Sequence, residues 1–264
     1  MFLKHPYRFN TLGNENNVAK FDNDALFDFY NEIIRPENMV ISIVGDVDSK
    51  KILNLANEKF GTMKSGSFKK LKLENEPVAT EIREKIQKEQ DKAQMHIIIG
   101  FQAPNIYDED KYAFEVMNSI MAGQGGRLFL ELRDKQSLAY TVTSFHTPGL
   151  ETGYFGVYIG TAPQKEQEAI EGIKNQLALL LKDGVSDDEL NRAKSYIVGN
   201  FEIGLQKNSS QAAKIGFDEL YDIGWDEYKS YPQKILDVTK DDVLKVARKY
   251  IDLDKYTIAI VKPE

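Results

Sequence analysis

The chain has 264 residues, of which 42% are hydrophobic, and its 13 tyrosines and 14 phenylalanines supply a substantial core, which argues against global disorder. Its formal net charge is −7 without a long basic run, which argues against nucleic acid and anionic membranes as partners. The absence of cysteine excludes disulfides and thiolate metal sites and favours a reducing, cytoplasmic compartment. No apolar run approaches the roughly 20 residues that span a bilayer, so we expect a soluble protein.

The first part of the chain predicts the end of a domain. After a stretch of loop and turn, the expected elements are a helix, a compact buried strand and a second helix, at residues 22–34, 38–45 and 46–61. Met1 is followed neither by a signal segment nor by an element that opens a domain, so we expect the natural polypeptide to extend upstream. The segment 62–80 contains many Lys, Ser and Gly residues and is the predicted linker.

Residues 81–264 predict a complete second domain. Strands are expected at about 81–88, 94–101, 138–145, 153–160 and 255–261. Helices are expected at about 108–122, 163–182, 186–205, 209–223, 225–235 (interrupted at Pro232) and 239–250. The first two strands suggest a hairpin that turns at Asp91-Lys92, and the next two suggest a second pair. Hairpins and separate helices without repeated βαβ units predict the α+β class with a largely antiparallel sheet.

One stretch, residues 122–143, combines three kinds of local chemistry. It opens with a flexible turn that contains Gly123, Gly125 and Gly126. A short amphipathic helix follows and ends near Ser137, and a strand begins at Leu138. Arg133 near the helix end and Tyr140 early in the strand can project into one space, where a guanidinium and a phenol suit a carbonyl or an oxyanion. From residue type alone, a solvated helix arginine and a core strand tyrosine are the more ordinary interpretation.

The residues offer no metal site. The histidines are His5 in the terminal segment, His96 in an apolar strand, where we expect a satisfied core residue, and His146 in a loop. No H-x-x-E-H motif is present. The acidic run Asp187–Glu189 fits a capped helix start behind Ser186 better than a metal site. The glycine turn lies between two helices, which argues against dinucleotide binding.

The motif L-x-L-R-D-K-Q-S-L-A-Y-T-V resembles the second domain of the insulinase (pitrilysin-like) zinc metallopeptidase family, which includes the mitochondrial processing peptidases. Members carry a glycine-rich turn, then L-F-x-E-L-R-E-K, then G-L-A-Y-x-V, and Arg133 and Tyr140 match their arginine and tyrosine. Upstream, P-E-N-M-V and V-G-D-V at residues 36–47 are similar to the family's P-x-N-M-x-L-x-V-x-G-D-V segment. Ile34 departs from the pattern, since many members have an aromatic residue there.

The resemblance implies a mitochondrial-processing-peptidase-like metallohydrolase fold. Residues 1–61 would be the C-terminal remnant of a first peptidase-like domain, residues 62–80 a linker, and residues 81–264 a second domain that binds no zinc. Zinc would lie in the missing upstream domain or in a partner, so that a homologous zinc-bearing domain acts in cis or in trans on a peptide or unfolded polypeptide. By the resemblance, Tyr140 would donate to the oxyanion and Arg133 would hold a substrate carbonyl.

Two other interpretations stay open. A non-catalytic scaffold or regulatory subunit of the same family would retain this second domain without an H-x-x-E-H motif upstream. An unrelated peptide-binding module is the third. We expect this chain to be inactive alone.

Overall fold

The computed structural model describes residues 1–66, 73–74, 76–90 and 93–264. The chain divides into two compact units. Unit 1 comprises residues 1–4, 75–199 and 233–264, and unit 2 comprises residues 5–74 and 200–232. Part of the predicted linker, residues 67–72 and 75, lies outside the described residues. The predicted division into a remnant, a linker and a second domain stays a prediction.

Unit 1 is built on a five-stranded sheet with the order β1-β5-β2-β4-β3. The strands are β1 (Arg83–Glu89), β2 (Met95–Ala103), β3 (Thr141–Thr147), β4 (Gly153–Thr161) and β5 (Thr257–Pro263). The β1–β5 pair is parallel, and the β2–β4, β2–β5 and β3–β4 pairs are antiparallel. These pairings confirm the predicted α+β class and the mostly antiparallel sheet.

One of the two predicted strand pairs forms. Strands β3 and β4 pair with Val142 opposite Ile159, as expected. The hairpin between β1 and β2 is wrong, because β5 lies between them. Its expected turn, Asp91-Lys92, lies outside the described residues. The composition explains the order: β1 is mostly charged, which suits the edge of a sheet, whereas β5 contributes the buried Ile258 and Ile260 to the interior.

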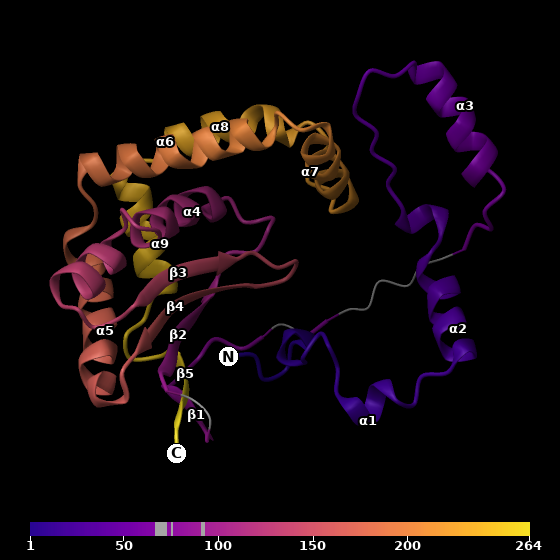
Figure 1. Cartoon of the computed structure of the whole chain (residues 1–264). Helices are drawn as coiled ribbons and strands as arrows, with labels where there is room; N and C mark the ends of the chain where they lie inside the picture. The colour runs from indigo at the N-terminus through magenta and orange to yellow at the C-terminus, as the bar shows by residue number, and fades with distance from the viewer. Residues whose placement is uncertain (67–72, 75, 91–92) are drawn as a thin grey trace. The chain divides into compact units, whose positions relative to one another are not determined.

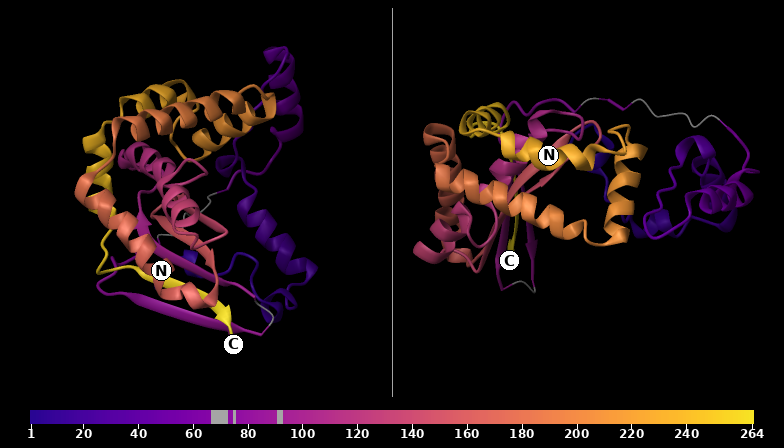
Figure 2. Two further views of the ribbon diagram at one scale, coloured as in Figure 1. Left: turned by 60° about the vertical axis from the view of Figure 1, so that its left-hand side comes forward. Right: turned by 90° about the horizontal axis from the view of Figure 1, so that it is seen from above.

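Three helices pack against this sheet and against one another: α4 (Asp110–Met121), α5 (Glu166–Asp183) and α9 (Lys240–Tyr250) (Figures 1 and 2). A 3-10 turn, Pro163–Lys165, precedes α5 at the predicted proline start. Along β2, Ile97 and Ile99 are fully buried, whereas Ile98 between them is 37% exposed. Successive strand residues point to opposite faces, so the helices cover one face of the sheet more fully than the other.

The remaining helices in the second half of the chain are α6 (Asp187–Gly204), α7 (Asn208–Leu220) and α8 (Glu227–Asp237). Pro232 lies inside α8, which continues through it. The predicted capping box at α6 is confirmed, since Ser186 Oγ accepts from the Glu189 backbone N–H at 3.3 Å and the Glu189 carboxylate accepts from the Ser186 N–H at 2.9 Å. Thr239 caps α9, at the start of the helix predicted at about residues 239–250.

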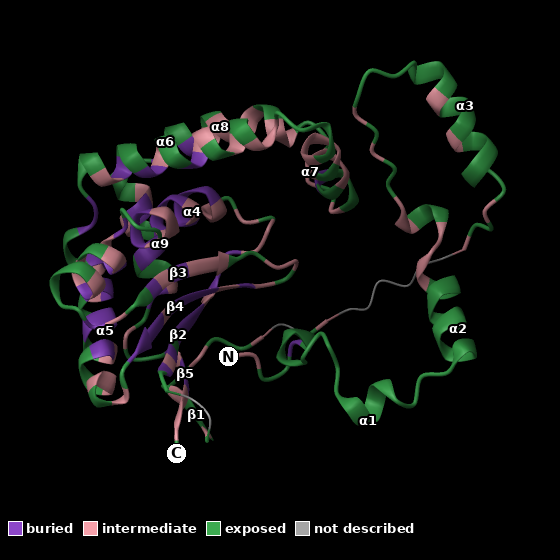
Figure 3. Cartoon of the chain, in the orientation of Figure 1, coloured by how far each residue is buried: buried purple, intermediate pink, exposed green. Residues whose placement is uncertain are grey.

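In unit 2 the helices α1 (Glu15–Val18), α2 (Asn23–Ile33) and α3 (Ser49–Phe60) are largely exposed (Figure 3). The two longer helices confirm the predicted ones. The buried strand at residues 38–45 is wrong: a 3-10 turn, Pro36–Asn38, precedes chain without a described strand, and Ile41 and Ile43 are 48% and 49% exposed. A strand needs a neighbour for its backbone hydrogen bonds, and the described residues give this segment none.

Within the described ranges, no helix combines the length and the apolar character needed to cross a membrane.

Candidate functional site

The candidate site begins at the glycine turn that follows α4. Gly123 adopts φ +74°, a left-handed conformation that favours glycine. A Cβ at Gly126 would lie 2.0 Å from the carbonyl oxygen of Ala122, so only glycine fits there. A Cβ at Gly125 would make only ordinary van der Waals contact, 3.8 Å from Arg192 Nε. The predicted turn is therefore present, and its flexibility stays a prediction.

The helix after the turn is wound differently from the expectation. Residues Phe129–Lys135 form a π-helix in place of the predicted α-helical segment. Its interior side is fixed by Leu132, which is fully buried. It ends where the Ser137 N–H donates to the carbonyl of Arg133 at 3.0 Å, with Ser137 itself at φ +50°. π-Helical segments are rare and occur frequently at functional sites, which makes this segment a better site candidate.

The loop between the π-helix and β3 is held from several sides. The Leu138 N–H donates to the Leu132 carbonyl at 2.8 Å, and the Thr161 hydroxyl donates to the Leu138 carbonyl at 2.6 Å. Helix α5 approaches closely at Gly172, where an added Cβ would lie 2.9 Å from Leu132 Cδ2 and 3.2 Å from Leu138 Cδ1. The backbone on both sides of the candidate residues is thus fixed by packing, as a preorganised site requires.

The structure brings Arg133 and Tyr140 together. The guanidinium carbon of Arg133 lies 5.3 Å from the centre of the Tyr140 ring and 4.5 Å from the centre of the Phe129 ring, both within cation–π range. Across the described parts of the chain, neither the guanidinium nor the phenol hydroxyl has a hydrogen-bond or ion-pair partner. Both polar groups are therefore available to a ligand.

The placement of Tyr140 corrects the more ordinary expectation. A core strand tyrosine would be buried, whereas Tyr140 is 76% exposed and lies one residue before β3. Leu138, which is 5% exposed, takes the core position instead. Arg133 lies on the helix as expected, where it is half-buried against two rings.

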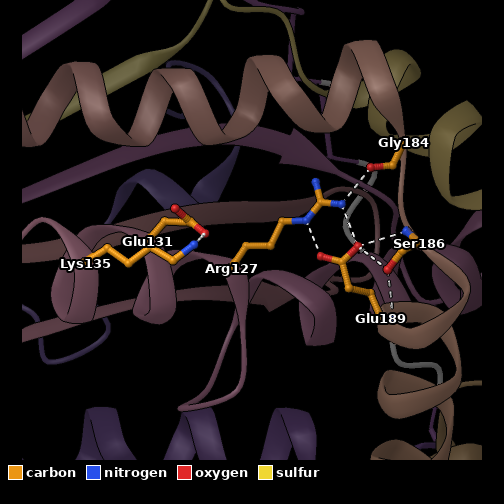
Figure 4. A network of polar contacts seen from close by, with 6 residues as sticks. All are labelled: Arg127, Glu131, Lys135, Gly184, Ser186 and Glu189. Carbon is orange, nitrogen blue, oxygen red and sulfur yellow. Dashed lines mark hydrogen bonds and ion pairs between the residues drawn. The ribbon is translucent and has the colours of Figure 1, made fainter.

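A second polar arrangement lies at the start of the same segment (Figure 4). Arg127 donates through Nε and Nη2 to the two carboxylate oxygens of Glu189 at 2.5 and 2.7 Å, and through Nη2 to the carbonyl of Gly184 at 2.8 Å. The Arg127 side chain is 18% exposed and that of Glu189 17%. The hydrogen bond from Arg127 is the main cause that lowers the pKa of Glu189 from 4.5 to about 2.

This ion pair was not predicted from the sequence. The acidic run was correctly assigned to the start of a helix, but the partner of Glu189 lies 62 residues upstream, and no local pattern links the two. The pair joins the chain after the glycine turn to the loop that leads into α6. It supports the position of the π-helix and is separate from the pair Arg133 and Tyr140.

The histidines occupy structural positions. His96 in β2 is satisfied, because its Nδ1 lies 2.8 Å from the hydroxyl of Tyr158. His146 lies in β3, so the expected loop position is wrong; its Nε2 is 3.3 Å from the Pro104 carbonyl, and burial lowers its pKa. His5 in the terminal segment is fully buried and caps a 3-10 turn. The described residues contain no group of three His, Asp or Glu side chains that could hold a metal ion, so they do not fit a zinc site.

A comparison with protein families identifies the fold's relatives. A family model described as the peptidase M16 inactive domain matches residues 20–197. The chain belongs to this family. Its membership confirms the resemblance to the insulinase-like metallopeptidases and to the fold of the processing peptidases.

Named relatives agree with this membership. The chain is 27% identical over 263 residues to an uncharacterised zinc protease of Bacillus subtilis, with 98% of this chain and 62% of that protein covered. It is 30% identical over 253 residues to an uncharacterised zinc protease of Streptomyces coelicolor, with 90% and 53% covered. The crystal structure of a peptidase M16 inactive domain from Pseudomonas fluorescens matches with a TM-score of 0.89 at 22% identity, over 100% of this chain and 63% of that one. The chain thus spans less than two thirds of the length of each.

Proposed function

We propose that this chain is the C-terminal part of an insulinase-like zinc metalloendopeptidase and that it contributes peptide binding and oxyanion stabilisation to proteolysis. The observation that carries the proposal is the placement of Arg133 beside Tyr140, with both polar groups unpaired across the described chain. The family match and the zinc proteases among the relatives support it.

Tyr140 would act as the oxyanion donor. Its hydroxyl is on a largely exposed side chain, while the backbone that carries it is held by buried Leu138. A donor fixed before the reaction stabilises developing negative charge without reorganisation, and removal of one such donor typically lowers turnover by about 100- to 1,000-fold. The phenol suits this role because its hydroxyl donates a hydrogen bond.

Arg133 would hold an oxygen acceptor of the peptide. Its guanidinium presents several N–H donors in one plane. A carbonyl or carboxylate of a bound peptide would accept hydrogen bonds from these donors, which would fix the peptide beside Tyr140.

Zinc would come from a homologous domain, in cis or in trans. Since the described residues do not fit a zinc site, every step at the metal belongs to that other domain. In the complete site, zinc would supply the activation of water, and the residues of this chain would bind and polarise the peptide.

Residues 1–61 would be the end of that first domain, and residues 81–264 the second domain. Helix α2 supports this division, because its apolar side chains Leu26, Phe27, Phe29 and Tyr30 are 54–66% exposed. An amphipathic helix buries its apolar face in its native surroundings. The upstream part of the protein, for which the length of the relatives leaves room, is the proposed cover.

The substitution Tyr140→Phe in the complete protein tests the oxyanion role. We expect the turnover number to fall at least 30-fold, with KM changed by less than about threefold, because the lost hydrogen bond forms mainly in the transition state. Tyr221→Phe is the matched control, since Tyr221 also has no hydroxyl partner in the described structure and stacks on Phe217. Unchanged turnover in Tyr140→Phe would remove the oxyanion role, whereas an absence of turnover in the complete wild-type protein would favour a non-catalytic scaffold subunit.

A further inference from the structure

Arg133 is held without hydrogen bonds from its side chain. Its guanidinium is in contact with the rings of Phe129 and Tyr140, at 4.5 and 5.3 Å from the ring centres, and the described residues offer it no acceptor. A free arginine side chain has many rotamers, and ordering it costs entropy. Something other than an acceptor must therefore restrict it.

We propose that Phe129 is a positioning residue of the candidate site: its ring holds the Arg133 guanidinium beside Tyr140 and leaves the N–H donors free for a planar oxygen acceptor of a peptide. The peptide part of this inference rests on the proposed function. The contact between the two side chains rests on the structure alone.

The π-helix places the two residues correctly. Phe129 is the first residue of the segment and Arg133 lies four residues later, so both side chains lie on the same side of the helix. Leu132 is buried on the interior side, and Phe129 is only half-buried. The Phe129 ring is therefore available to the guanidinium, in contrast to a phenylalanine that fills the core.

The contact leaves the charge of Arg133 uncompensated. A cation–π contact at an exposed position favours the held arrangement by roughly 2- to 5-fold, and it uses the ring face without consuming an N–H donor. The carboxylate of Glu131, two residues earlier in the chain, is paired with Lys135 at 2.6 Å (Figure 4). The planar donor fork of an arginine matches a carboxylate best, and it also accepts a peptide carbonyl.

Side-chain NMR of the full chain tests the positioning role. We expect the Arg133 Nε–Hε group to be ordered in the wild type and mobile in Phe129→Leu, which keeps an apolar side chain but removes the ring. Phe129→Tyr should restore the order, because it keeps the aromatic face. An order parameter in Phe129→Leu that equals the wild-type value would overturn the proposal.

Peptide binding tests the consequence. The probes are a fluorescent ten-residue alanine-rich peptide with a free C-terminal carboxylate and the same peptide with a C-terminal amide. We expect Phe129→Leu to weaken binding about 3- to 10-fold and Phe129→Tyr to stay within twofold of the wild type. A loss confined to the carboxylate peptide would assign the acceptor to the terminus, and an equal loss for both would assign it to backbone carbonyls. Normal binding by Phe129→Leu would contradict the inference.

The two readouts separate this inference from the function on which it rests. If Phe129→Leu releases Arg133 and no variant binds either peptide, the positioning contact stands and the proposed peptide-binding function fails.

Discussion

The ion pair between Arg127 and Glu189 gives the sharpest stability prediction. Glu189 accepts two hydrogen bonds from Arg127 and two from Ser186, one from its backbone N–H and one from its hydroxyl. The substitution Glu189→Gln keeps the size of the side chain but removes the charge and half of its acceptor capacity. It leaves the Arg127 cation, only 18% exposed, without its counter-charge. We therefore expect a clear loss of stability.

The magnitude follows from the pKa. A difference of one pKa unit corresponds to 1.36 kcal/mol, so the lowering from 4.5 to about 2 sets an upper bound of roughly 3 kcal/mol at neutral pH. Both side chains keep some contact with solvent, and screening reduces the expected loss to about 2 kcal/mol. The pKa is lower in the folded state, so the stabilisation is present above about pH 4.5 and disappears as the pH falls towards 2.

Equilibrium urea unfolding at several pH values measures this loss. Hydrogen exchange of sheet peptides would report unit 1 separately from unit 2, because two units need not unfold together. Asp187→Asn is the control: this carboxylate pairs with Lys240 at 2.8 Å but is 75% exposed, and we expect it to cost less than about 0.5 kcal/mol. Equal losses in the two variants at neutral pH, or a Glu189→Gln loss that is undiminished at pH 2, would refute the reasoning.

Two further substitutions test the packing of unit 1. Gly172→Ala should destabilise unit 1 by about 1–3 kcal/mol and shift the NMR signals of Tyr140, because the added methyl group meets fully buried Leu132. Unaltered signals and an unaltered urea midpoint would show that α5 does not support the site. Thr239→Ala should cost about 1 kcal/mol of stability, because it removes the cap of α9. Faster amide exchange in the first turn of that helix would measure this loss. An unchanged exchange rate would argue that Asp242 alone caps the helix.

Features set by neighbouring residues were predictable from the sequence. The capping box at Ser186, the cap at Thr239 and the helix after Asp48 each depend on side chains within three residues of the helix start, and all are present. The antiparallel pair of β3 and β4 was also predictable, because the two strands are consecutive in the chain.

Features set by distant residues were not predictable. The insertion of β5 between β1 and β2 depends on a strand more than 150 residues downstream. The only feature of the sequence that indicated this strand order was the contrast between a charged β1 and an apolar β5. The partner of Glu189 was hidden for the same reason. The strand expected around Ile41 failed because local β-propensity is insufficient when no neighbouring strand is available.

The candidate site lies between these cases. The family pattern singled out Arg133 and Tyr140, but sequence spacing did not reveal that the helix is a π-helix or that Phe129 contacts the guanidinium. Both features are properties of the folded unit, in which Leu132 of the π-helix packs against α5.

The most direct measurement of the central claim is peptide cleavage by the complete natural polypeptide, by this chain alone and by a version of the complete polypeptide that lacks residues 81–264. The account predicts cleavage by the complete polypeptide only, with turnover that falls at least 30-fold when Tyr140 becomes phenylalanine. Equal cleavage with and without residues 81–264 would contradict it.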